Sequence, residues 1–530
     1  MKKSASYLRP DIQVEPLIDS WYAWSHLIAP ATAARNLTER HLKIMNSYVG
    51  GAQIHAKAVE NPQMAGGPFI DYKGGRVDEI AALRDATKKK RTHMLALSKA
   101  LGDLDCMLRQ QAKGYSLQPL YANVPDILKG YVELVYDLNS QPSFRLVEPL
   151  MYSSNFYSPD AQSLALSISA GDERPFVLST PRLPEDSMCL WQVPFKERRL
   201  DQLFQLKSAP QSLTAIRDLL DCGEATWAQM QTFMTEDKPK PYQRYEGRGV
   251  RWRYFGHACI LVETADTSIL FDPVLSYAHQ HGIPRYTYQD LPDKIDYVAI
   301  THNHQDHVLF ETLLQIRHKT EHIIVPPSNE GALQDPSLRL ILKQCGFTNV
   351  MEMHELDEIA IPNGSITAIP FFGEHSDLNI RSKMAYAVRL GRHSLLFAAD
   401  SCNIEPQLYR HVQREIGDVE VLFLGMECDG APLSWLYGPL LTQPVERAMS
   451  DSRRLAGCDY DQANEIVNSC ACKEVYVYAM GQEPWLNYIM SLKYTDQSRP
   501  IVESNKLIAK CQERGICAER LFGEKEILLS

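Results

Sequence analysis

The run Thr301-His302-Asn303-His304-Gln305-Asp306-His307 places three histidines and one aspartate within six positions. Imidazole and carboxylate groups are the usual protein ligands of divalent transition metals. A buried polar group without a partner costs about 1–3 kcal/mol, so this cluster is hard to explain as packed core. His302 and His304 would serve one metal ion, and Asp306 and His307 a second. The spacing therefore predicts a dinuclear metal site.

The segments on either side of this motif indicate how it is positioned. Residues 294–300 end in apolar and β-branched side chains, a pattern typical of a buried strand. Residues 308–316 carry apolar side chains at helical spacing. The motif is therefore expected on a strand-to-helix loop, where its side chains can converge on one point.

Length and composition narrow the class of protein. A chain of 530 residues with 45% apolar residues is expected to fold into two globular domains. Its formal charge of −10 argues against a nucleic-acid partner. The first residues have no apolar run typical of a secretory signal, and no stretch approaches the ~20 apolar residues of a membrane span. Twelve scattered cysteines are then most simply reduced thiols, which predicts a cytoplasmic protein.

The first 240 residues show no metal-binding pattern. Residues 78–111 have apolar side chains at intervals of three to four and are predicted to form one helix, with a second short helix over 127–139. Residues 163–169 alternate as a half-buried strand does. The charged, proline-containing stretch 235–241 is the best linker. We therefore expect a mixed α+β domain over 1–240 and a catalytic domain over 241–530.

The second half resembles the metallo-β-lactamase superfamily. The resemblance is carried by the His-x-His-x-Asp-His run after a buried strand, by Asp272 at the end of an earlier strand, and by Asp400 after a later hairpin. It implies an αββα sandwich with a dinuclear metal site at the edges of the sheets. The fold alone does not fix the chemistry.

Two departures from the hydrolases of this superfamily point to one branch of it. The loop that presents a third motif histidine in those hydrolases here contains Glu374 next to His375, and no histidine follows His411. Both features are similar to the diiron aminoacyl β-hydroxylases of the chloramphenicol type, which the chain resembles along nearly its whole length. The resemblance implies that the six metal ligands are His302, His304, Asp306, His307, Glu374 and Asp400.

The resemblance also implies a function. It predicts a non-heme diiron monooxygenase of antibiotic biosynthesis that hydroxylates the β-carbon of an amino acid, with dioxygen as co-substrate. The amino acid would be held as a thioester on the phosphopantetheine of a nonribosomal peptide synthetase carrier domain. The two irons would cycle between Fe²⁺ and Fe³⁺ with an oxo or hydroxo bridge, and an external donor would supply electrons. The N-terminal domain would dock the carrier or form a homodimer.

The nature of residue 374 separates this reading from its alternative. Three imidazoles and three carboxylates form an oxygen-rich set, which favours iron or manganese. A hydrolase needs a metal-bound water of near-neutral pKa, which more neutral ligands promote. If His375 bound metal in place of the catalytic Glu374, a dizinc hydrolase of esters, thioesters or lactams would remain open. His257 and Asp272 are expected to serve the scaffold, with an outer hydrogen bond from His257 as a second option.

Overall fold

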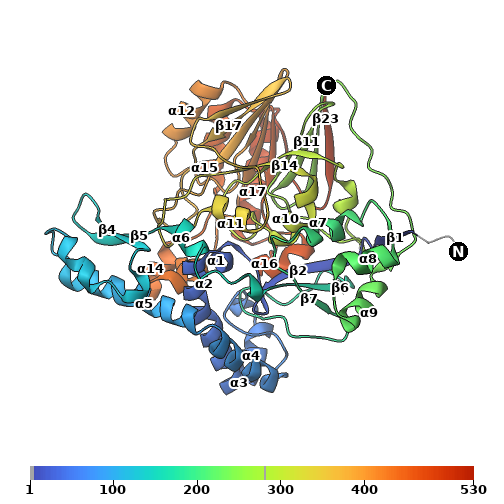
Figure 1. Cartoon of the computed structure of the whole chain (residues 1–530). Helices are drawn as coiled ribbons and strands as arrows, with labels where there is room; N and C mark the ends of the chain where they lie inside the picture. Colours follow the sequence, from blue (N-terminus) through green and yellow to red (C-terminus); the bar gives the residue numbers. More distant parts are fainter. Residues whose placement is uncertain (1–4, 280–281) are drawn as a thin grey trace.

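The computed structural model describes residues 5–279 and 282–530, and within these residues two seven-stranded sheets dominate the C-terminal half (Figure 1). The first sheet has the order β15-β14-β13-β12-β11-β10-β23. Its strands are β10 (Val250–Gly256), β11 (Cys259–Glu263), β12 (Ser268–Phe271), β13 (Ile295–Ala299), β14 (Thr320–Val325), β15 (Val350–Glu352) and β23 (Lys525–Leu529). From β12 to β15 the strands run parallel, so their carboxyl ends share one edge.

The second sheet has the order β16-β17-β18-β19-β20-β21-β22 and is parallel from β19 to β22. Its strands are β16 (Glu358–Ile361), β17 (Gly364–Ile369), β18 (Ala385–Leu390), β19 (His393–Phe397), β20 (Val421–Gly425), β21 (Glu474–Tyr478) and β22 (Cys517–Arg520). Because successive side chains of a strand point to opposite faces, a strand covered on both sides must be apolar throughout. Strand β20 is such a strand, Val-Leu-Phe-Leu-Gly, and is wholly buried.

The two sheets pack face to face around one apolar core and are covered outside by helices. Phe423 of β20 belongs to the core between the sheets, whereas its neighbours Leu422 and Leu424 belong to the outer core. The helices α12 (Gln407–Ile416), α15 (Tyr460–Cys470) and α17 (Arg499–Glu513) contribute to that outer core. Across the molecule, α10 (Phe310–Ile316) and α11 (Leu338–Gln344) cover the first sheet. This confirms the predicted αββα sandwich.

The N-terminal part is mixed α+β, as predicted. Its main sheet has the order β3-β2-β6-β7, with β2 (Ile12–Ile18) and β6 (Gln162–Ile168) paired along seven residues. The remaining two strands are β3 (Trp21–Tyr22) and β7 (Cys189–Gln192), and the adjoining helices are α1 (Ser25–Ile28), α2 (Pro30–Asn36) and α3 (Leu42–Glu60). A π-helical turn over Leu37–His41 joins α2 to α3.

Two helix predictions in this part were wrong. The expected single helix over 78–111 is two helices, α4 (Val77–Lys90) and α5 (Thr92–Gln111), because the chain breaks at Arg91, whose side chain turns inward to Asp19. The expected helix over 127–139 is instead the first strand of a hairpin, β4 (Val132–Tyr136) and β5 (Pro142–Leu146). There the buried Val132 and Leu134 flank the exposed Glu133, which is the period of a strand.

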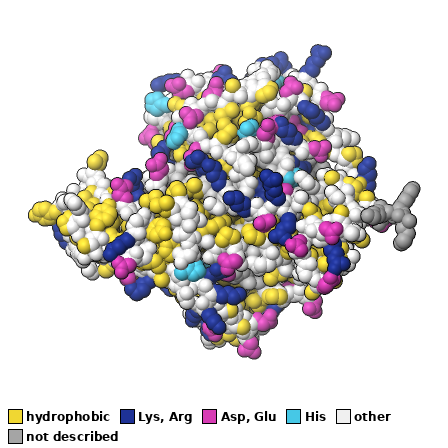
Figure 2. All heavy atoms as spheres, viewed as in Figure 1, with side chains coloured by type: hydrophobic (Ala, Val, Ile, Leu, Met, Phe, Trp, Pro, Cys, Tyr) yellow, Lys and Arg dark blue, Asp and Glu magenta, His cyan; other side chains and the backbone are white. Residues whose placement is uncertain are grey.

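The N-terminal and C-terminal parts share one hydrophobic core. A single cluster of buried side chains extends from Leu8 to Ile489 and includes residues of both parts. Polar contacts reinforce it: the Tyr22 hydroxyl donates to Glu311 of α10 at 2.8 Å, and the Arg174 guanidinium lies 3.0 Å from the same carboxylate. On the face shown in Figure 2, acidic and basic side chains are intermingled. Among the described helices, none has the length and apolarity that a membrane span requires.

Candidate metal centre

The histidine-rich motif lies where its flanking segments predicted, on the loop between β13 and α10. This loop leaves the carboxyl edge of the first sheet, and every motif residue but Asp306 is buried. The backbone N–H of Thr301 donates to Asp272 Oδ1 at 2.7 Å, and that of Asn303 donates to the Ser382 carbonyl oxygen at 3.1 Å. The loop is thereby tied to β12 on one side and to the second sheet on the other.

His302, His304 and Glu374 form the first group of converging side chains. His304 Nδ1 lies 2.5 Å from Glu374 Oε1, and His302 Nε2 lies 3.9 Å from Glu374 Oε2. All three residues are buried, and their ligand atoms lie within 4.8 Å of one another. Glu374 follows β17 and has φ 71°, a left-handed conformation that non-glycine residues rarely adopt. The backbone turn aims its carboxylate at the two imidazoles.

A second group forms around Asp400, which follows β19. Asp400 Oδ2 lies 3.3 Å from His307 Nε2 and 3.8 Å from His302 Nε2. Asp306 Oδ2 lies 3.7 Å from the same nitrogen of His307. The carboxylate of Asp400 thus faces one imidazole of each predicted pair.

Four buried atoms in these groups have no hydrogen-bond partner among the described residues: His302 Nε2, His307 Nε2, Glu374 Oε2 and Asp400 Oδ1. Each such atom costs about 1–3 kcal/mol if nothing binds it. Two are imidazole nitrogens and two are carboxylate oxygens, and they occur within one small volume. Divalent metal ions satisfy both kinds of atom at once, so the residues present fit a pair of such ions.

Two outer residues hold the second group in place. Asp272 Oδ2 lies 2.8 Å from His307 Nδ1 and accepts from the Thr301 hydroxyl at 2.6 Å, which leaves His307 Nε2 to face the site. The N–H of Gly481 donates to His257 Nδ1, so the Nε2–H of His257 donates to Asp306 Oδ2 at 3.0 Å. Such outer hydrogen bonds fix the orientation of metal ligands.

The electrostatic field of this group favours a cation. Burial opposes protonation of His307, but the negative charges of Asp400, Asp272 and Asp306 outweigh burial and hold its pKa well above the ordinary value. Burial likewise acts to raise the pKa of Asp306, yet His307 and the hydrogen bond from His257 hold that pKa below its usual range. The field that would keep a proton on His307 would also hold a metal ion in its place.

The Tyr437 hydroxyl bridges two histidines on the other side of the site. It lies 3.1 Å from His304 Nε2 and 2.8 Å from His375 Nδ1, and His375 Nε2 lies 3.1 Å from Glu374 Oε2. Burial, followed by the charge of His304, holds the pKa of His375 well below its ordinary value, so this ring is neutral. His375 therefore contacts the back of Glu374 through the ring nitrogen that does not face Tyr437.

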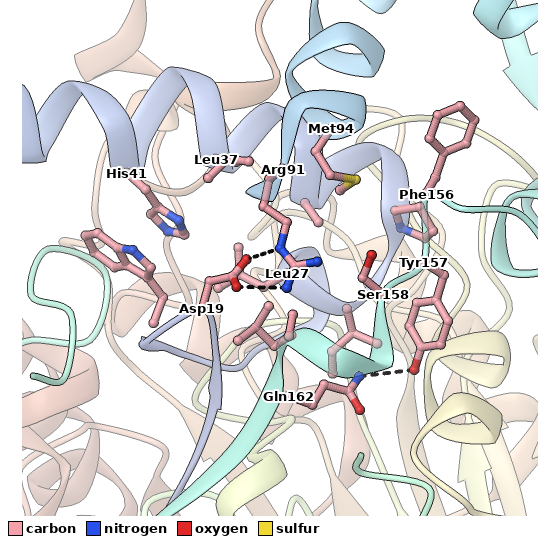
Figure 3. A pocket seen from close by; sticks show the side chains of 16 residues that line it. Asp19, Leu27, Leu37, His41, Arg91, Met94, Phe156, Tyr157, Ser158 and Gln162 are labelled. Atoms are coloured by element: carbon pink, nitrogen blue, oxygen red, sulfur yellow. Dashed lines mark hydrogen bonds and ion pairs between the residues drawn. The ribbon is translucent and has the colours of Figure 1, made fainter. Parts of the chain in front are cut away.

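A cavity of about 260 Å³ opens onto the metal-binding side chains. Glu374, Asp400 and Asp306 lie in its wall together with Trp435 and Arg454. Its wall also includes Ala65 and Gly66, so both parts of the chain contribute to it. A smaller cavity of about 60 Å³ in the N-terminal part shares none of these lining residues (Figure 3).

Comparison with known proteins identifies the family. Residues 7–239 match the family described as diiron non-heme beta-hydroxylase N-terminal domain, and residues 267–432 match the beta-lactamase superfamily domain. The chain is 41% identical over 534 residues to the 4-amino-L-phenylalanyl-[CmlP-peptidyl-carrier-protein] 3-hydroxylase of Streptomyces venezuelae, with 98% of this chain and 99% of that protein covered. The chain belongs to the diiron non-heme β-hydroxylases.

A solved structure of this family has the same fold. The crystal structure of CmlA, a diiron β-hydroxylase from Streptomyces venezuelae, superposes with a TM-score of 0.93 at 39% identity and covers 100% of both chains. A UPF0173 protein of Pyrococcus abyssi is 30% identical over 122 residues, which cover 23% of this chain and 48% of that protein. The likeness to the β-hydroxylase therefore spans both parts of the chain.

As a diiron β-hydroxylase, the protein is a non-heme diiron monooxygenase whose family carries two iron ions. The six predicted ligands lie together in the structure, and their assignment as ligands stays a prediction. His257 and Asp272 contact these residues directly, so the less favoured option for His257, an outer hydrogen bond, is the one the structure contains. Two aromatic residues also lie at the site, where Trp435 lines the cavity and Tyr437 contacts His304.

Sequence reasoning missed two acidic residues of the cavity wall, Asp429 and Glu427, of which Glu427 is the more buried. Glu427 lies two residues beyond β20, at the same carboxyl edge from which Asp400 emerges. The available signal was the wholly apolar strand that precedes it, because acidic residues just beyond buried parallel strands gather at one edge of a sheet.

Proposed function

We propose that this protein uses dioxygen and external electrons to hydroxylate the β-carbon of an aminoacyl group carried as a thioester on a peptide synthetase carrier domain. The observation that carries the proposal is the set of unpartnered imidazole and carboxylate atoms at the inner wall of a cavity. Bound iron would supply the oxygen chemistry there. The hydrolase alternative is not favoured, since the whole-length relative is a hydroxylase of an aminoacyl carrier protein.

We assign His302, His304 and Glu374 to one iron and Asp306 and His307 to the other, with Asp400 between them. The distances from Asp400 to His302 and His307 support this division. Glu374 is the catalytic carboxylate of the assignment, because it has one oxygen near His304 and one without a hydrogen-bond partner. Trp435 and Leu436 would exclude water from the bound acyl chain.

The function is tested by mass spectrometry of loaded carriers. A carrier domain is charged in turn with each standard amino acid and with 4-amino-L-phenylalanine, then incubated with iron-loaded enzyme, reductant and isotopically labelled dioxygen. We expect one acyl group to gain a single labelled oxygen atom at its β-carbon. Release of the acyl group in the absence of dioxygen would contradict the proposal and favour hydrolysis.

The ligand assignment is tested by replacing each of two neighbouring residues, Glu374 and His375, with alanine. We expect Glu374→Ala to lose iron and activity, whereas His375→Ala keeps most of its iron, because the ring nitrogens of His375 contact Glu374 and Tyr437 and the residue belongs to none of the groups of metal-binding side chains that the described residues form. Iron is measured in the purified proteins, and circular dichroism checks that both variants fold. Normal iron in Glu374→Ala together with iron loss in His375→Ala would reverse the assignment.

We further propose that the protein is a homodimer that works in the cytoplasm. The hairpin of β4 and β5 projects from the body of the molecule with α5 (Figure 1), and its turn exposes Leu138 fully. Isolated two-stranded hairpins are marginal in water, and a second copy would cover this one. Light scattering of Leu138→Asp should then give the mass of a monomer. The twelve cysteines, all without disulfides, suit a reducing compartment.

A further inference from the structure

Glu427 occupies a distinctive place in the wall of the large cavity. Strands β19 and β20 are parallel neighbours, so Asp400 and Glu427, which follow them, emerge side by side at one edge of the sheet. Both residues line the cavity. Glu427 is not a member of any of the metal-binding groups that the described residues form. It is therefore an acidic group next to the reaction site that the metal ions do not require.

One oxygen of this carboxylate is held by the protein and the other is left open. Tyr494 donates its hydroxyl to Glu427 Oε1 at 3.2 Å. Within the described residues, Oε2 has no hydrogen bond, and no basic side chain forms an ion pair with this carboxylate. A Cβ atom at position 430 would clash with the Leu455 carbonyl oxygen and lie 2.9 Å from Oε2, so only glycine fits at this position beside the carboxylate.

The basic side chain in the wall of this cavity binds backbone carbonyl groups and not Glu427. Arg454 lines the same cavity, but its guanidinium donates to the carbonyl oxygens of Gly430 and Asp429 at 2.6 and 3.2 Å. Burial, and then the negative charge of Asp400, raises the pKa of Glu427 to about 8. Among the described residues this carboxyl group thus forms no ion pair, although the charge of Arg454 also acts on it, and a cation that entered the cavity would favour its ionised form.

The proposed substrate brings such a cation. In an aminoacyl thioester the carboxyl carbon is bonded to sulfur, so the α-ammonium is the charge nearest to the β-carbon that reacts. Two divalent ions with three carboxylates leave the metal centre with a net charge of about +1, which repels an ammonium group. An anion placed beside the centre, but not bound to it, would offset this repulsion.

We propose that Glu427, oriented by Tyr494, binds the α-ammonium group of the aminoacyl substrate and so directs its β-carbon toward the metal centre. This inference rests on the proposed function and adds a requirement to it: the amine of the substrate must be free. The enzyme then acts on the aminoacyl carrier before a condensation reaction converts the amine to an amide.

The test compares three acyl groups on the same carrier. They are the amino acid that turns over in the panel above, its N-acetyl derivative, and the analogue with hydrogen in place of the amine. For the wild-type enzyme we expect kcat/KM for the free amine to exceed that for the hydrogen analogue about tenfold to a hundredfold, the effect of one charge-assisted hydrogen bond. The N-acetyl derivative should be at least as poor.

Glu427→Gln is the decisive variant, because it keeps the size of the side chain and an acceptor for Tyr494. We expect it to bind normal iron and to process the free amine and the hydrogen analogue within about threefold of each other. Glu415→Gln is the matched control, since it removes the same charge by the same change from an exposed side chain of α12 that does not line the cavity. It should keep the wild-type preference.

Each other result overturns the inference. Loss of iron from Glu427→Gln would make Glu427 a metal ligand, and an equal slowing with both acyl groups would make it a proton donor or a structural residue. Wild-type enzyme without preference for the free amine would also reject it. Wild-type enzyme that oxygenates no loaded carrier would instead reject the proposed function, so the two failures are distinct.

Discussion

The cavity beside Arg91 and the cavity beside Glu374 differ in how the charged side chains around them are paired. In the N-terminal cavity, Arg91 reaches to Asp19 with two hydrogen bonds of 2.7 and 2.9 Å, as Figure 3 shows. In the cavity beside Glu374, carboxylate oxygens and imidazole nitrogens face one another, and several of these atoms have no hydrogen-bond partner among the described residues. The first arrangement is complete within the chain, whereas the second requires cations from outside.

The largest expected effect separates these two kinds of charge. We expect Asp400→Ala to lower the affinity for iron strongly, because Asp400 faces both His302 and His307. The fall should exceed the roughly 10- to 100-fold loss of affinity that removal of an outer hydrogen bond causes. Iron content and dioxygen-dependent hydroxylation measure this effect. Asp19→Asn is the control and should keep its iron. Equal iron loss in both variants would erase the distinction between the cavities.

Breaking the pair in the N-terminal cavity should cost stability rather than metal. Arg91→Met leaves the Asp19 carboxylate, only 21% exposed, without its cation, and removing one partner of a buried pair costs about 3 kcal/mol. We expect a lower midpoint of urea unfolding with unchanged iron per folded chain. The double variant Arg91→Met with Asp19→Leu should recover much of the loss. Iron loss in Arg91→Met would couple the two cavities.

A smaller effect is expected from the residue that orients His307. Asp272→Asn weakens the hydrogen bond to His307 Nδ1 while keeping the size of the side chain. We expect the affinity for iron to fall about 10- to 100-fold. Competition with a chelator would measure this fall, and excess iron should restore activity. Unaltered affinity would show that Thr301 alone orients the loop.

Lys207 is a basic residue of the N-terminal part that does not follow the pattern of Arg91. Its buried amine has no hydrogen-bond partner among the residues that the structure describes, and burial lowers its pKa to about 7 from the ordinary 10.5. Between these values the unfolded chain binds a proton that the folded chain does not, so stability should rise with pH by about 1.4 kcal/mol per unit. Lys207→Met should abolish this rise without loss of hydroxylation, as urea unfolding at pH 7 and pH 9 would measure. A loss of activity in this variant would show that Lys207 is needed for hydroxylation.

The sequence was most informative where the chemistry is local. Four of the predicted ligands are consecutive or nearly so, and Glu374 and Asp400 lie on loops that the resemblance to the superfamily singled out. The same logic failed for the helix over 78–111, because the break at Arg91 is caused by an ion pair with a residue 72 positions away. Local periodicity contains no information about such a partner.

The outer contacts of the site depend on packing between distant segments. His257 is fixed by Gly481, and Tyr437 meets His304 from a helix 133 positions later. Glu427 comes to lie beside Asp400 only because β19 and β20 are neighbours in the sheet. These contacts follow from the order of strands in the sheet, which the identity of the residues does not reveal.

The segment that contains Tyr437 is held by hydrogen bonds from arginines of the N-terminal part. Arg40 donates to the carbonyl oxygen of Trp435 at 2.6 Å, and Arg35 donates to those of Pro439 and Leu441 at 3.1 Å each. Recombination between relatives would separate these arginines from the carbonyls that they hold whenever a crossover fell between the two halves. The two halves are therefore expected to be inherited as one unit, and chimaeras of distant parents should assemble poorly around His304.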